Sequence, residues 1–372
     1  MHISSLADSM PISSFNKSLL IAVVFCINAL STVAQPLHSD LLKKTYLEYV
    51  TNLPKYLLTT KSAVVLIAPN RNEVTLMAQE IHPYLVKSGI DAVAYYHVDD
   101  LFINDELSQK LSENLDKREI KYIIVIEKQQ GNYCLIITAH EEQSDFVKAG
   151  NKAWKMERKS LSDIGKSLYS LAYSMERKNY LIIDIPEFPP LDIEVKGRRY
   201  EAYRPDLKSE KLAIRYFAKL DDPDSLIVNE DADKVRQYIR QRNTEIDALN
   251  KQLEQQFANY PYPYELVDAS ISDKELNDKE LRYVLQNVHS TNKECREALG
   301  YSEKTEVTEY VSVSMNNGQG SINRIPANEI VYKYYVCHIP SSSLYLGTKW
   351  DADASWGQAL QNYLQLMKAE ID

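Results

Sequence analysis

The sequence predicts an α/β protein with two similar mixed-sheet domains, each of two or three layers and each in the order β-α-β-α-β-β-α. Two observations predict this class: strand-like apolar runs alternate with helix-patterned segments, and the alternation occurs twice along the chain. A chain of 372 residues is also too long for one ordinary hydrophobic core and suggests about two domains.

The first domain is expected at 35–190. Its unbroken apolar run at 62–69 is typical of a strand that is buried on both faces. Elsewhere, apolar residues spaced three and four apart indicate helices that bury one face. Strands are expected at 62–69, 91–98, 121–128, 133–138 and 180–185, and helices at 41–58, 74–85, 107–115 and 164–175.

The second domain is expected at 212–372, after a linker at 191–211 that belongs to a proline-rich stretch. Its hairpin strands, 333–340 and 344–347, resemble 121–128 and 133–138 of the first domain. Its other expected elements are a strand at 225–228, a long helix from Asp231 to about Phe257, a strand at 264–269, a helix through Leu276, Leu281, Val284 and Leu285, and a last helix from Trp356.

The last helix of each domain carries the same pattern at a constant offset of 192 residues. The matched positions are Ile164, Gly165, Leu168, Ala172 and Met175 in the first domain and Trp356, Gly357, Leu360, Leu364 and Met367 in the second. This fixed offset favours an internal duplication. The alternative is a chance likeness between two domains that share an order of elements common to α/β proteins.

The N-terminus has the pattern of a signal peptide at 1–34. Lys17 precedes an apolar run, Leu19–Leu30, that is shorter than the roughly 20 residues a membrane-spanning helix needs. Small residues after this run predict cleavage after Ala34. An uncleaved anchor is the second interpretation, and lipidation at Cys26 is the third. The mature protein is therefore expected in the periplasm or outside a bacterial cell, without a stable membrane span.

Three cysteines remain after such a cleavage, Cys134, Cys295 and Cys337. Cys295 and Cys337 fall in one domain, so they are the pair expected to bridge in an oxidising compartment. The alternative is that all three are small buried residues.

Composition and motifs exclude several classes of function. The net charge of −9 disfavours nucleic acid and anionic membranes as partners. Glycine occurs only 10 times, and the chain has neither a Walker loop nor a Gly-x-Ser-x-Gly elbow. The stretch Gly318–Asn323 fails as a dinucleotide fingerprint because Asn323 replaces its third glycine. No cofactor is therefore expected.

Candidate catalytic residues follow the strand expected at 91–98. The carboxyl ends of strands in open α/β sheets are where ligands bind. His97, Asp99 and Asp100 stand there and offer acid, base or metal-ligand chemistry. The structural alternative is a polar turn with a hydrogen-bonded histidine.

Candidate binding residues are aromatic, because aromatic clusters stack on sugar rings or anchor protein partners. They are Trp154, Trp350, Trp356, Tyr260 and Tyr262. The alternative for the tryptophans is core packing, and for the Tyr–Pro run it is an extended entry into a strand.

Asp351 and Asp353 precede the last helix and are candidate ligands for a hard cation such as calcium. The favoured alternative is that this acidic segment caps the helix, because Asp and Ser accept hydrogen bonds from the free N–H groups of a first turn.

Two functions remain. The first is a non-catalytic binding or accessory module of the bacterial envelope that contacts a protein or a glycan, and the alternative is a hydrolase using the acidic and histidine site of the first domain. The export signal, the duplication and the missing catalytic signatures favour the binding module over an enzyme.

Overall fold

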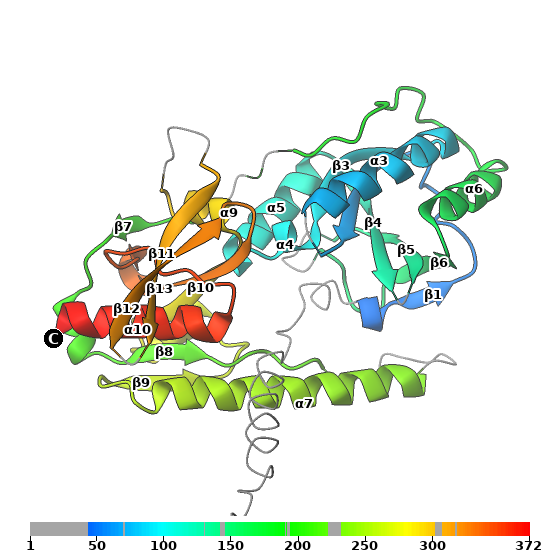
Figure 1. Cartoon of the computed structure of the whole chain (residues 1–372). Coiled ribbons are helices and arrows are strands. Elements are labelled where there is room, and N and C mark those ends of the chain that lie inside the picture. The colour runs from blue at the N-terminus through cyan, green and yellow to red at the C-terminus, as the bar shows by residue number, and fades with distance from the viewer. Residues whose placement is uncertain are drawn as a thin grey trace, which may run out of the picture. The chain divides into compact units, whose positions relative to one another are not determined.

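The computed structural model describes residues 44–69, 71–129, 131–141, 146–189, 191, 194–221, 232–301, 307–316 and 318–372, all within one compact unit, Pro36–Asp372. In this part of the chain, two mixed sheets of six strands each are combined with helices (Figure 1). The predicted signal peptide and the strand expected at 225–228 lie outside the described residues. None of the described helices has the length and apolar character needed to cross a membrane.

The first sheet has the strand order β1-β6-β5-β4-β2-β3. Its strands are β1 (Glu48–Val50), β2 (Lys61–Ile67), β3 (Asp91–His97), β4 (Ile120–Gln129), β5 (Asn132–Ala139) and β6 (Lys152–Arg158). The helices of this half are α3 (Arg71–Ser88), α4 (Val98–Leu101), α5 (Asp105–Lys117) and α6 (Leu161–Ala172), and a short 3-10 helix at Lys44–Tyr46 precedes β1.

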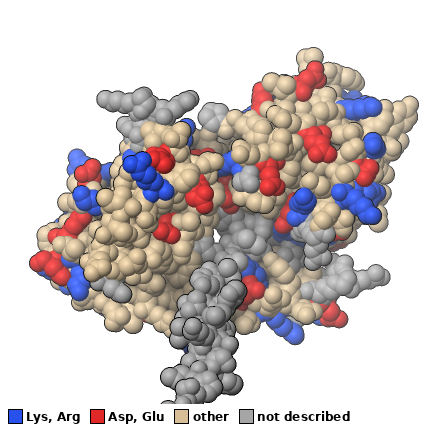
Figure 2. All heavy atoms as spheres, in the orientation of Figure 1, with Lys and Arg blue, Asp and Glu red and all other residues tan. Residues whose placement is uncertain are grey.

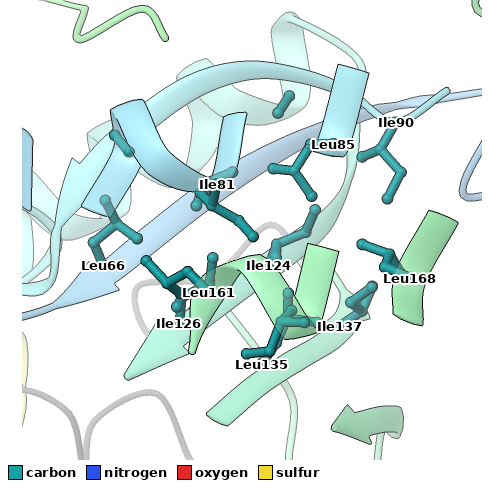
Figure 3. Packing of buried hydrophobic residues seen from close by; sticks show 14 of the residues in the cluster. Leu66, Ile81, Leu85, Ile90, Ile124, Ile126, Leu135, Ile137, Leu161 and Leu168 are labelled. Atoms are coloured by element: carbon teal, nitrogen blue, oxygen red, sulfur yellow. The ribbon is translucent and has the colours of Figure 1, made fainter. Parts of the chain in front are cut away.

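Both faces of the first sheet are buried, which makes this half a three-layer sandwich. Successive side chains of a strand point to opposite faces. Val64 and Leu66 of β2 accordingly belong to the core under α3 and α6 (Figure 3), whereas Ala63 and Val65 belong to the core on the other face, with Leu115 of α5. This two-sided burial explains the unbroken apolar run of β2.

The second sheet has the order β7-β14-β13-β10-β8-β9. Its strands are β7 (Arg198–Tyr200), β8 (Leu212–Arg215), β9 (Tyr264–Val267), β10 (Tyr283–Thr291), β13 (Ile330–His338) and β14 (Ser343–Tyr345). The other elements are α7 (Ala232–Phe257), α8 (Asp273–Asp278), α9 (Asn292–Ala298), a hairpin of β11 (Glu309–Asn316) and β12 (Gln319–Pro326), α10 (Trp356–Ile371), and 3-10 helices at Pro205–Lys208 and Ile339–Ser341.

The two sheets follow one plan. Read from β1 to β3 and from β7 to β9, the neighbouring strands pair parallel, antiparallel, antiparallel, parallel and parallel in both sheets. The fold class predicted from the sequence is therefore confirmed. The shared plan supports the predicted duplication, which remains an inference about how the chain arose.

The repeated helix occupies equivalent places in both halves. Helix α6 packs against α3, and α10 packs against α7. Each of the two matched glycines faces that neighbouring helix: a Cβ at Gly165 would overlap the ring of Tyr84, and one at Gly357 would lie 3.7 Å from Nε2 of Gln256. The pattern that the last helices of the two halves share thus corresponds to a repeated helix–helix contact, which is tighter in the first half.

The match predicted from the sequence between the hairpin strands of the two halves is wrong, because it is displaced by one strand. The run 333–340 lies on β13, which takes the place of β5 rather than β4. The true counterpart of β4 is β10, where Val284 and Leu285 were expected on a helix. Their helix-like spacing arises because β10 is a central strand, paired on one edge with β8 and on the other with β13, and is apolar on both faces.

Two other expectations about elements are wrong. The described part of the helix expected at 41–58 holds a 3-10 turn and β1 instead, because residues 48–50 pair with β6. The segment 180–185 is irregular, and Pro186 beside it lacks the N–H that a continued ladder would need. The linker 191–211 also contains β7, which pairs with β14 at the edge of the second sheet.

The two glycines make a matched test of the helix contacts. Gly165→Ala should lower the free energy of unfolding by about 1–3 kcal/mol, because the new methyl group would overlap Tyr84. Gly357→Ala should leave stability unchanged or raise it by up to about 1 kcal/mol, the helix propensity of alanine over glycine. Urea denaturation measures both, and equal effects of the two substitutions would contradict this account of the repeat.

Candidate ligand-binding cavity

A cavity of about 450 Å³ lies at the carboxyl ends of β2 and β3. This volume falls within the range of about 300–1,000 Å³ that is typical of small-molecule sites. The first half, the segment before β7 and the second half all contribute to its wall. The lining residues are Arg71, Tyr95, Asp100, Phe188, Pro189, Leu191, Thr291, Lys293, Glu294, Glu297, Ala327 and Asn328.

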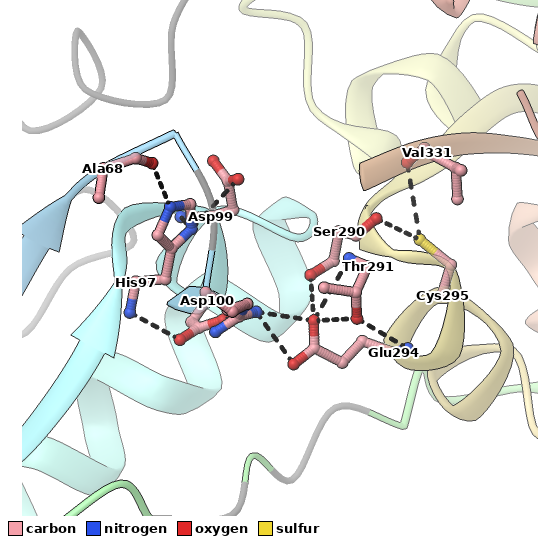
Figure 4. A network of polar contacts seen from close by, with 10 residues as sticks. Ala68, His97, Asp99, Asp100, Ser290, Thr291, Glu294, Cys295 and Val331 are labelled. Carbon is pink, nitrogen blue, oxygen red and sulfur yellow. Dashed lines mark hydrogen bonds and ion pairs between the residues drawn. The ribbon is translucent and has the colours of Figure 1, made fainter. Parts of the chain in front are cut away.

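The charged part of the wall is built on Arg71, the first residue of α3. Its Nη2 forms an ion pair with Oδ1 of Asp100 and lies 3.0 and 2.7 Å from the two carboxylate oxygens of Glu294. The network shown in Figure 4 therefore joins α4 of the first half to α9 of the second. One guanidinium is shared by two carboxylates from distant parts of the sequence.

Helix caps fix both carboxylates. Asp100 is the third residue of α4, and its Oδ2 accepts a hydrogen bond from the backbone N–H of His97 at 2.8 Å. Glu294 is the third residue of α9, and its Oε2 accepts bonds from the hydroxyls of Thr291 and Ser290 at 2.7 and 2.6 Å. Because each carboxylate is held by its own helix start, both are set in position for Arg71.

Burial sets the electrostatics of this network. Burial raises the pKa of Asp100 to about 6, although the charge of Arg71 opposes the rise. Burial lowers the pKa of Arg71, but Asp100 and Glu294 raise it by more, so it ends above its ordinary value. Arg71 is therefore always charged, whereas Asp100 exchanges its proton in mildly acidic solution.

The structure brings His97, Asp99 and Asp100 together at one strand end, as predicted, but only Asp100 lines the cavity. His97 is buried and caps α4: its Nε2 donates to the carbonyl of Ala68 at 2.8 Å, and its Nδ1 accepts from the backbone N–H of Asp99 at 3.2 Å. Burial lowers the pKa of His97, but the carboxylate of Asp99, the carbonyl of Ala68 and the charge of Asp100 together raise it by more. The geometry matches the structural alternative for this histidine.

The candidate aromatic residues lie away from the cavity wall. Trp154, Trp350 and Trp356 are each at most 7% exposed, so they pack in the interior. Tyr260 is also buried, and the hydroxyl of Tyr262 donates to the C-terminal Asp372. The core-packing alternative describes the tryptophans.

Trp350 nevertheless positions the helix that lines the cavity. Its Nε1 donates to Oδ1 of Asn292, the first residue of α9, at 3.0 Å. The guanidinium of Arg296, also on α9, lies 4.8, 4.7 and 4.9 Å from the ring centres of Tyr301, Tyr310 and Trp350. This aromatic cage anchors α9 by cation–π contacts.

Asp351 and Asp353 have structural partners. Asp351 is 1% exposed and lies 2.7 Å from Nζ of the equally buried Lys333. Asp353 accepts from the backbone N–H of Ser355 at 2.9 Å, while Ser355 precedes α10 without a capping bond from its side chain. Among the described residues, no group of three or more His, Cys, Asp or Glu could hold a metal ion.

Cys295 and Cys337 are free, buried thiols in the structure, as is Cys134. The expected bridge between Cys295 and Cys337 is therefore not formed. Cys295 instead lies in the middle of α9, where its Sγ is 3.5 Å from the carbonyl of Ser290 and 3.7 Å from that of Val331.

Sequence reasoning missed Arg71, Lys293, Glu294 and Glu297. Arg71 had a usable signal, because it follows the carboxyl end of a strand that was correctly predicted. The residues of α9 had no such signal, because part of the preceding strand, β10, is predicted from the sequence to be helical. Phe188 lies in the proline-rich stretch between the two halves, which the sequence marks only as a domain boundary.

Comparison with known protein families finds no match, and no curated protein shows a significant similarity in sequence. The function must therefore be argued from the cavity itself.

The raised pKa of Asp100 predicts how stability depends on pH. Between pH 3.8 and about 6 the folded protein binds more protons at Asp100 than the unfolded chain does, so its contribution to stability is lost as the pH rises through this window. Relative to Asp100→Asn, the wild type should lose about 2 kcal/mol between pH 4 and 6, at no more than about 1.36 kcal/mol per pH unit, and its stability should then level off by about pH 7. Urea denaturation at several pH values measures this difference, and a flat difference through the window would contradict it.

Proposed function

We propose that the protein is an exported, non-catalytic binding module whose cavity receives a small ligand or a side chain of a partner. One observation carries the proposal: the reactive groups of the wall are already bound to one another. Arg71 is held by Asp100 and Glu294, and the hydroxyl of Thr291 is bonded to Glu294. Such groups shape and charge a binding surface without leaving a nucleophile activated by a base.

The composition of the wall also supports binding. Phe188, Pro189 and Leu191 form an apolar side that faces a few convergent polar groups, the usual make-up of a ligand site. On the face of the molecule in Figure 2, lysine and arginine are interspersed with acidic residues rather than gathered into a basic patch. This distribution agrees with the exclusion of nucleic acid drawn from the net charge.

The hydrolase alternative has one observation in its favour, the pKa of Asp100 near 6. A general base, however, needs a free lone pair directed at the substrate. Each oxygen of Asp100 already has a partner, Arg71 for one and the N–H of His97 for the other, and the charge of Arg71 lowers the basicity of the carboxylate. Binding therefore remains the better account of the cavity.

Filling the cavity tests the proposal. Ala327 lies in the turn between β12 and β13 on the cavity wall, so Ala327→Trp should block the cavity without disturbing either sheet. A small-molecule library screened by ligand-observed NMR should give hits with the wild type that are lost in this variant. Ala258→Trp, at an exposed position after α7, should keep them.

Two results would overturn binding at this cavity. One is the absence of any hit, and the other is a set of hits that survives in Ala327→Trp. A turnover of hydrolase substrates that disappears in Asp100→Asn would instead favour the enzyme.

The proposed export has its own test. The protein produced in a bacterial host should be recovered from the periplasm or the medium, with Gln35 as its first residue. Ala34→Leu should slow cleavage, because signal peptidase requires a small residue there, and leave the longer form in the membrane fraction. N-terminal sequencing and fractionation measure both, and an intact N-terminus in the cytoplasm would contradict the export proposal.

A further inference from the structure

We propose that the cavity binds a primary ammonium group carried on an apolar stem, an inference that rests on the proposed binding function. The charges of the wall are the first reason. Asp100, Glu294 and Glu297 oppose Arg71 and Lys293, which gives three acidic groups against two basic ones. A cation therefore complements the cavity better than an anion does.

The basic residues are poorly placed to bind an anion. Arg71 already pairs with two carboxylates through Nη2, so an incoming anion would have to compete with Asp100 and Glu294 for the same guanidinium. It would also face their negative charges at close range. Like-charge contacts of this kind are costly in a partly buried site.

Glu297 is the carboxylate most accessible to a ligand. Its side chain is 47% exposed, and its Oε1 lies 3.8 Å from Nζ of Lys293 one turn earlier on α9. Exposed pairs of this type contribute little to stability, because water screens both charges. A ligand ammonium can therefore replace Lys293 at Glu297, and the released Lys293 returns to water.

Aromatic rings provide the surface for the stem. Tyr95 and Phe188 both line the cavity, with ring centres 5.8 Å apart. The hydroxyl of Tyr95 is bonded to Nδ1 of His82 at 2.6 Å, and Pro189 and Leu191 extend the apolar side. Methylene groups pack on such a wall, and a ring face also attracts the cation itself.

An ammonium on an apolar stem has two sources, a free diamine or a lysine side chain of a partner protein. Leu181, Ile183 and Ile185 are exposed on the segment that leads to Phe188. Exposed apolar residues a few positions before a cavity residue in the sequence suit a partner whose chain continues past its lysine. The chemistry at the cavity is the same for both sources.

Three probes of equal chain length test the inference by isothermal titration calorimetry with the purified protein. They are 1,5-diaminopentane, pentane-1,5-diol and glutarate, each with a chain of five carbons and with ends that are cationic, neutral and anionic, respectively. Diaminopentane should bind at least tenfold more tightly than the other two, a difference of about 1.4 kcal/mol. Tighter binding of a capped Leu-Lys-Leu peptide than of diaminopentane would identify a protein lysine as the source, and equal or weaker binding would identify a free amine.

Variants locate the contact. Glu297→Gln keeps the shape of the side chain and should weaken diaminopentane binding about tenfold, whereas Glu176→Gln, at an exposed position after α6, should change nothing. Phe188→Ala should weaken binding several-fold, because it removes the ring wall.

Binding of glutarate or the diol as tight as that of diaminopentane, or an unaffected Glu297→Gln variant, would overturn the ammonium inference. If library hits are still lost in Ala327→Trp, the binding function stands and only the ligand class is wrong. If no compound depends on the cavity, the proposed function itself fails.

Discussion

The arrangement of the cavity depends on a single guanidinium. Arg71 stands at the start of α3, and its charge is shared by Asp100 of α4 and Glu294 of α9. Without it, two partly or fully buried carboxylates from different halves of the chain would face each other without compensation, a costly arrangement in a medium of low dielectric constant. The ion pairs therefore hold the two walls of the cavity in contact, and the helix caps at His97 and Thr291 decide where each carboxylate stands.

The cavity lies where the second half has elements that the first half lacks. In the first half, only two residues separate β4 from β5, whereas in the second half α9 and the β11–β12 hairpin stand between β10 and β13. These inserted elements and the turns that flank them supply Lys293, Glu294, Glu297 and Ala327 to the wall. The shared strand plan gives two similar scaffolds, and the inserted segment gives one of them a surface that complements the strand ends of the other.

Most of the fold could be predicted because the buried faces of helices and strands produce regularly spaced apolar residues in the sequence. The run at β2, the helices α3, α5, α6, α7 and α10, and β3 before His97 were all expected close to where they lie. The errors fall where two periods look alike or where the local pattern misleads. The apolar spacing of β10 resembles that of a helix. Lys333 is a charged residue in a strand, yet it is fully buried beside Asp351, whose pKa is raised by burial to about 6. No local pattern reveals a charge whose partner lies 18 positions away.

The sequence by itself determined the class of fold, because this follows from hydrophobic periodicity and from the order of the elements. It also predicted an internal duplication and a site at the end of one strand. Only the tertiary structure decided which residues form that site. It assigned His97 to a helix cap and the three tryptophans to the interior, and it placed Glu294 beside Arg71 across 223 positions of sequence. The physical reason is that an ion pair or a cavity wall requires proximity in space, which depends on how both sheets and their connecting segments pack and not on any spacing along the chain.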